Sequence, residues 1–75
     1  MENEGREIRM LENRVRELRA RFKWTQLDLA NAIGVTRQTI GLIEKGDYSP
    51  SVTMALKIAE AFNVSVEDVF YLRKE

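Results

Sequence analysis

Residues 25–46, TQLDLANAIGVTRQTIGLIEKG, decide the fold of this 75-residue chain. Two segments with helical apolar spacing, 26–33 and 37–45, are separated by the three residues 34–36. A turn this short cannot reverse the chain into an antiparallel hairpin, so the two helices must cross steeply. The sequence therefore predicts a helix-turn-helix over residues 26–45.

The residue types around this turn suit a close crossing of two helices. Ala30 is small where the helices approach each other, and Gly34 can adopt the positive φ that the turn requires. Val35 fills the angle between the helices, and Ile40 and Ile43 anchor the second helix to the core. Each residue is ordinary helix or turn material by itself, but the combination at these offsets is specific.

Polar residues indicate where the helices begin. Thr25 and Thr36 can accept hydrogen bonds from the first turns of the two central helices. Ser51 and Ser65 stand in the same relation to a fourth and a fifth helix. Gly46 ends the helix that follows Thr36, because glycine tolerates the left-handed conformation of a helix exit.

Apolar spacing predicts the buried faces of the remaining helices. A first helix over residues 7–22 carries a stripe of Ile8, Leu11, Val15, Leu18 and Phe22. The fourth helix is expected to bury Ala55, Leu56, Ile58, Ala59 and Phe62, and the fifth carries Val66, Val69, Phe70 and Leu72. Strand-type alternation is absent outside 64–66, so the predicted fold class is all-α. We expect a single five-helix domain over residues 7–75, after a disordered N-terminal extension over residues 1–6.

The composition excludes several classes of function. The chain has no cysteine and no histidine, which removes disulfides, thiolate metal sites and the commonest general base. No serine or lysine has an evident base, and there is no glycine-rich phosphate loop. We therefore expect no enzyme activity, no metal and no cofactor. Because no apolar stretch resembles a signal peptide or a membrane span, we also expect a soluble, cytoplasmic protein.

The net charge is zero, but the charges are unevenly distributed. Seven of the twelve basic residues lie between Arg6 and Lys23, where there are three acidic residues, and the balance turns acidic after Asp28. A chain of this kind can present a positive edge to a nucleic acid. The net charge therefore does not decide against DNA binding.

The pattern Q-x-x-x-A-x-x-x-G-V-x-x-x-x-I-x-x-x-E, from Gln26 to Glu44, resembles the helix-turn-helix of the Cro and phage-repressor family, also called the xenobiotic-response-element family. The later stretch ALKIAEAFNVSVEDVF is similar to the fourth and fifth helices of that family. The resemblance covers residues 13–72 and implies a phage-repressor-like domain. It also implies a transcriptional regulator, usually a repressor, that binds specific double-stranded DNA sequences as a dimer.

The resemblance makes 37–45 the recognition helix, which enters the major groove. Arg37 and Gln38 then occupy the main base-reading positions, with Thr39 nearby, and Leu42 aligns with a further one. Arginine can contact guanine O6 and N7, and glutamine can contact adenine N6 and N7. Leu42 could meet a thymine methyl group or pack inward. Gly41 weakens the helix but lets DNA approach closely.

The resemblance also implies contacts to the phosphate backbone. Gln26 matches a glutamine that helps to hold a phosphate, and the backbone N–H groups at its helix start would assist. Arg19 matches an arginine that lies close to the DNA and pairs with the glutamate found here as Glu44, so we expect an Arg19–Glu44 ion pair. Weaker phosphate candidates are Lys45, Arg14, Tyr48 and Ser49.

A homodimer on a palindromic operator is the expected assembly. The expected interface is the C-terminal helix, with Val66, Val69, Phe70, Tyr71 and Leu72. In the alternative, the first three of these residues complete the core, and Tyr71 and Leu72 cover it. An antitoxin, or another protein-interaction module on the same fold, is the second interpretation of the whole chain, with a toxin as its protein partner.

Overall fold

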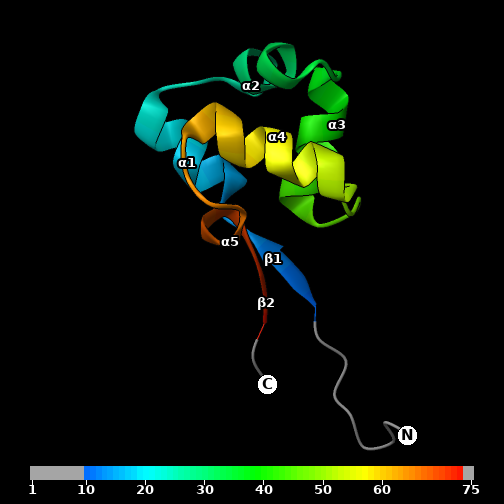
Figure 1. The fold of residues 1–75 in the computed structure, drawn as a ribbon. Coiled ribbons are helices and arrows are strands. Elements are labelled where there is room, and N and C mark those ends of the chain that lie inside the picture. The colour runs from blue at the N-terminus through cyan, green and yellow to red at the C-terminus, as the bar shows by residue number, and fades with distance from the viewer. Residues whose placement is uncertain (1–9, 74–75) are drawn as a thin grey trace, which may run out of the picture.

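The computed structural model describes residues 10–73 (Figure 1). Within this range the structure has five helices and a small two-stranded sheet. In chain order, the elements are β1 (Leu11–Asn13), α1 (Val15–Phe22), α2 (Gln26–Ile33), α3 (Arg37–Lys45), α4 (Val52–Phe62), α5 (Val66–Val69) and β2 (Phe70–Leu72). The fold is mostly helical, as predicted, and the expected N-terminal extension, residues 1–6, lies outside the described residues.

The helix boundaries follow the local signals in the sequence. Thr25 and Asp28 form a reciprocal capping box at the start of α2, and the Thr36 hydroxyl accepts a hydrogen bond from the backbone N–H of Thr39 at the start of α3. Gly34 and Gly46 end α2 and α3 with φ of +79° and +82°. These left-handed exits favour glycine, because a Cβ is strained in that conformation.

One apolar core holds the helices together. Every helix from α1 to α5 contributes a fully or almost fully buried side chain, and the core comprises Val15, Leu18, Leu29, Ala30, Ile33, Ile40, Ile43, Ile58, Ala59, Phe62 and Val69. Figure 1 shows α4 running through the middle of the bundle, with α1, α2 and α3 around it. Leu56 is an exception to the predicted inward face of α4, because its side chain is exposed.

The N-terminal helix is shorter than predicted. Leu11 lies in β1, and α1 begins at Val15. Asn13 is the last residue of β1, and its side chain forms hydrogen bonds at the start of α1. Its Oδ1 accepts a hydrogen bond from the backbone N–H of Val15 at 3.0 Å, and its Nδ2 donates to the carbonyl oxygen of Ile43 at 3.0 Å. The predicted helical residues 7–9 lie outside the described range.

The fifth helix is also shorter than predicted. It ends at Val69, and Phe70–Leu72 forms β2, which pairs antiparallel with β1 so that Leu11 lies opposite Leu72. Both strands extend away from the helices on the same side of the molecule (Figure 1). Val69 is fully buried in the core, so its predicted place in a dimer interface is wrong. Val66 and Phe70 are half-buried against the core, whereas Tyr71 and Leu72 are exposed.

None of the helices in residues 10–73 is long and apolar enough to cross a lipid bilayer.

Candidate DNA-binding surface

One face of α3 forms a wall of an open groove of about 410 Å³. The α3 residues in this wall are Arg37, Gln38, Gly41, Leu42 and Lys45, and Arg16 of α1 and Gln26 of α2 line the groove with them. These α3 positions recur at intervals of three or four residues, which is about one helical turn, so they lie on one face of the helix. The steep crossing of α2 and α3 leaves this face outside the core, because Ile40 and Ile43 turn the opposite face inward.

Arg37 and Gln38 are exposed in the first turn of α3. Neither side chain forms a hydrogen bond or an ion pair with another of residues 10–73. A guanidinium at the N-terminal end of a helix is slightly unfavourable, since the helix dipole is positive there. Among residues 10–73, the donors and acceptors of both side chains are therefore unpaired at the groove.

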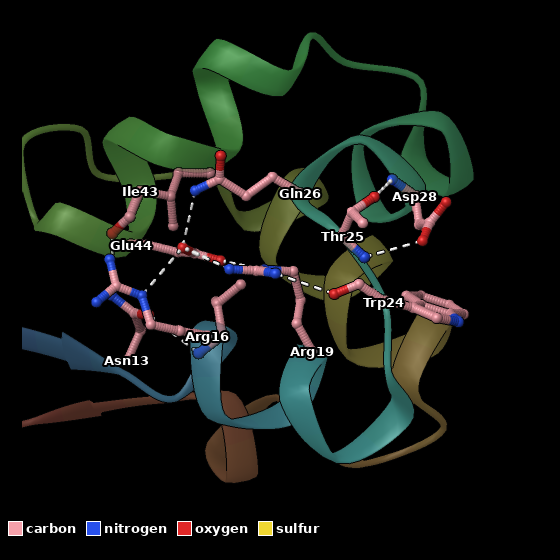
Figure 2. Close-up of polar contacts among 10 residues, drawn as sticks. Asn13, Arg16, Arg19, Trp24, Thr25, Gln26, Asp28, Ile43 and Glu44 are labelled. Atoms are coloured by element: carbon pink, nitrogen blue, oxygen red, sulfur yellow. Dashed lines mark hydrogen bonds and ion pairs between the residues drawn. The ribbon is translucent and has the colours of Figure 1, made fainter.

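Behind this face, the carboxylate of Glu44 is the centre of a polar network (Figure 2). Arg19 binds it with two contacts, Nε to Oε2 at 2.6 Å and Nη2 to Oε1 at 3.2 Å. Gln26 donates from Nε2 to Oε1 at 3.0 Å, and Arg16 Nε lies 3.5 Å from the same oxygen. The side chain of Glu44 is 1% exposed and that of Arg19 is 15% exposed, so the Arg19–Glu44 pair at the centre of this network is shielded from water.

The network keeps Glu44 ionised. Burial raises the pKa of Glu44, but the hydrogen bonds from Arg19 and Gln26 and the charges of Arg19 and Arg16 outweigh burial and lower that pKa below its ordinary value. The contacts between Arg19 and Glu44 confirm the ion pair expected from the family resemblance. It connects α1 and α3, and Gln26 adds α2, so three helices meet at one carboxylate (Figure 2).

The residues expected at the phosphate backbone are dispersed. Gln26 and Lys45 line the groove, and Tyr48 and Ser49 are exposed in the loop after α3. Arg19 is largely buried, and Nη1 donates to the carbonyl oxygen of Trp24 at 3.0 Å in addition to the contacts with Glu44. Arg14 does not line the groove: its guanidinium lies 4.2 Å from the centre of the Tyr71 ring, and it donates to the carbonyl oxygen of Asp68.

A sequence model described as helix-turn-helix matches residues 15–69, most of the chain. The chain belongs to the helix-turn-helix family of the Cro and phage-repressor type. An uncharacterized HTH-type transcriptional regulator of Bacillus subtilis, YgzD, is 55% identical over 65 residues, which are 87% of this chain and 98% of that protein. A similar regulator of Methanocaldococcus jannaschii is 50% identical over 60 residues, 80% of this chain and 91% of that one.

A solved structure supports the same assignment. The restriction-modification controller protein C.AhdI from Aeromonas hydrophila is 33% identical and matches with a TM-score of 0.70. The match covers 73% of this chain and 83% of that protein. The two central helices of this chain, α2 and α3, are thus the helix-turn-helix of the family.

Two groove features of this helix-turn-helix differ from the sequence-based expectation. Arg16 was not among the predicted contact residues, although it is exposed and lines the groove. Arg16 lies about one turn before Arg19 on the same helix, and this spacing is the sequence feature that could have predicted its place at the groove. Thr39 does not line the groove, and its hydroxyl lies 3.0 Å from the hydroxyl of Thr36, so its first role is in the cap of α3.

Proposed function

We propose that this protein is a transcriptional regulator, acting as a repressor, that binds double-stranded DNA with α3 in the major groove. The observation that carries the proposal is the pair of exposed side chains, Arg37 and Gln38, on a helix that the Glu44 network braces from behind. Arginine and glutamine are the side chains that read guanine and adenine with two hydrogen bonds each. A braced helix holds such side chains in a defined position.

Leu42 extends the proposed reading face. It is half-buried and lines the groove one turn after Gln38, where an apolar side chain can contact a thymine methyl group. In this proposal, Thr39 does not contact a base. It is half-buried beside the N-cap and stabilises the first turn of α3, which carries Arg37 and Gln38. The reading face is thus Arg37, Gln38 and Leu42.

Positive groups around the groove supply the contacts to phosphate. Arg16 and Lys45 are exposed at its rim. In this proposal, backbone N–H groups in the first turn of α2 are further donors for a phosphate. Arg19 acts mainly through Glu44, since its guanidinium is largely buried. Tyr48 and Ser49, in the exposed loop after α3, are further phosphate candidates in this proposal. Phosphate contacts set the register on DNA, whereas base contacts specify the sequence.

A homodimer that binds a palindromic operator in the cytoplasm completes the proposal. A single recognition helix contacts few base pairs, so two copies that read half-sites one helical turn apart gain both affinity and specificity. The proposed interface contains Tyr71 and Leu72, which are exposed on β2, together with the half-buried Val66 and Phe70. Val69 is excluded because the core of one copy already buries it.

Selection of bound duplexes from a random pool, at two salt concentrations, tests this function. The proposal predicts recovery of a palindromic sequence and a steep loss of affinity as salt increases. Arg21→Ala serves as a control, because this exposed arginine pairs with Glu17 outside the groove and should leave the selected sequence unchanged. Recovery of sequences with no common site would contradict the proposal.

A further inference from the structure

Gly41 lies in the wall of the groove, but the fold does not require a glycine there. Its φ is not in the left-handed region, unlike those of Gly34 and Gly46. A Cβ at this position would meet the amide of Gln26 at 3.6 Å from Nε2 and 3.9 Å from Oε1, which is ordinary van der Waals contact. Glycine is also less favourable than alanine in the interior of a helix. The folded chain alone therefore gives no reason for glycine.

The group that a Cβ would cover is the amide of Gln26. Because the ionised Glu44 carboxylate can accept but not donate hydrogen bonds, the amide nitrogen of Gln26 must face Glu44. The amide oxygen then lies on the side away from Glu44, as Figure 2 shows. Beside the bare Cα of Gly41, this oxygen is an acceptor at the groove that Arg37 and Gln38 also line.

The chemistry of this acceptor limits what it can bind. Phosphate oxygens are acceptors themselves, so they cannot donate to the amide oxygen. In the major groove, the groups that donate are the exocyclic amines, N6 of adenine and N4 of cytosine. The sequence-based assignment of Gln26 to a phosphate does not use this oxygen.

We propose that Gly41 leaves the opening through which the exocyclic amine of an adenine or a cytosine reaches the amide oxygen of Gln26. Gln26 is then a specificity-determining residue, and Glu44 is the positioning residue that fixes its amide. The inference rests on the proposed function, because it requires α3 to lie in the major groove. It adds a base contact from α2 to those from α3.

A protein–DNA double-mutant cycle tests the Gln26 contact. The selected site is compared with the same duplex in which one adenine or cytosine lacks its amino group, for the wild type and for Gln26→Met. We expect deletion of the amino group at one position to weaken wild-type binding by about 5- to 150-fold, the usual range for one specific contact. Gln26→Met should show no further loss at that position. Equal losses for both proteins at every position would overturn the proposal.

Gly41→Ala tests the opening. We expect the midpoint of thermal unfolding to rise by roughly 2–8 °C, because alanine favours the helix. Affinity for the selected site should fall at least about fivefold, the low end of one specific contact, and the preference for the amino-bearing base should disappear. The control is Asn31→Ala on the exposed face of α2, which should favour the helix without altering DNA binding.

Three results would count against these ideas in distinguishable ways. A Gly41→Ala protein that is less stable would overturn the premise that the fold does not need this glycine. A more stable variant that binds the selected site as tightly as the wild type would overturn the proposed opening. Failure of the wild type to select any sequence would instead overturn the proposed function itself.

Discussion

The guanidinium of Arg19 holds the carboxylate of Glu44 with two hydrogen bonds, and so fixes α1 to the C-terminal half of α3. The pair is shielded from water, and Gln26 and Arg16 approach the same carboxylate. A buried charge that loses its partner is strongly destabilising, since nothing else compensates its desolvation. The proposed reading face of α3 therefore depends on a contact that lies behind it.

Removal of the Glu44 carboxylate should destabilise the protein strongly. Glu44→Ala leaves Arg19 without its main partner, and we expect a loss of about 3–5 kcal/mol in the free energy of unfolding. Glu17→Ala is the matched control, because Glu17 pairs with Arg21 at i,i+4 on an exposed face and should contribute only about 0.3–0.5 kcal/mol. Urea unfolding followed by circular dichroism measures both. Equal losses would show that the Glu44 network does not brace the fold.

Acid should weaken the same network. The pKa of Glu44 is lower in the folded protein than its ordinary value of 4.5, so the unfolded chain binds more protons as the pH falls. The stabilisation is fully present above the ordinary pKa and is lost as the pH falls through the lowered pKa of the folded state. We expect the difference in unfolding free energy between the wild type and Glu44→Gln to decrease as the pH falls below about 5. A difference that does not change with pH in this acidic range would contradict a lowered pKa of Glu44 in the folded protein.

Gly34→Ala should have the opposite effect from Gly41→Ala. Gly34 has a φ of +79°, which an L-residue reaches at a cost of about 1–2 kcal/mol. Gly41 has no such requirement, and its replacement by alanine should stabilise the helix by about 0.5–1 kcal/mol. Thermal unfolding of the two variants should therefore shift in opposite directions. A shift of the same sign for both variants would contradict the claim that the backbone requires a left-handed conformation at Gly34 but not at Gly41.

Leu72→Asp should weaken the proposed homodimer without unfolding the domain. Leu72 is 49% exposed on β2, so a charge there is tolerated in one copy but is unfavourable in an apolar interface. Sedimentation should show a lower average mass, and binding to a palindromic site should become weaker. Leu56→Asp, at an exposed position of α4, is the control and should leave the mass unchanged. An unchanged mass for Leu72→Asp would place the dimer contact elsewhere.

The sequence was sufficient to predict the parts of the fold that have local signals. The helices around the turn could be predicted because Thr25, Thr36, Gly34 and Gly46 each act within one turn of the chain. The Arg19–Glu44 pair is a contact between distant residues, and the family resemblance, not the local pattern, made it predictable.

The two strands could not be predicted from local signals. Each has three residues, and Leu11 matches the helical stripe as well as it matches a strand. Their pairing joins opposite ends of the chain, which no short window of sequence can reveal. The sequence left open whether Val69 lies in the core or in a dimer interface for a related reason, because its burial depends on how α5 packs against the other helices.

The most direct test of the proposed function is the binding of Arg37→Ala to the selected site and to its single-base variants. Arg37 is exposed in the groove and has no partner among the described side chains, so its loss should not affect folding. We predict a loss of about 1–3 kcal/mol for the selected site, together with loss of discrimination at one guanine position. An equal loss for every sequence, with discrimination intact, would contradict base reading by α3.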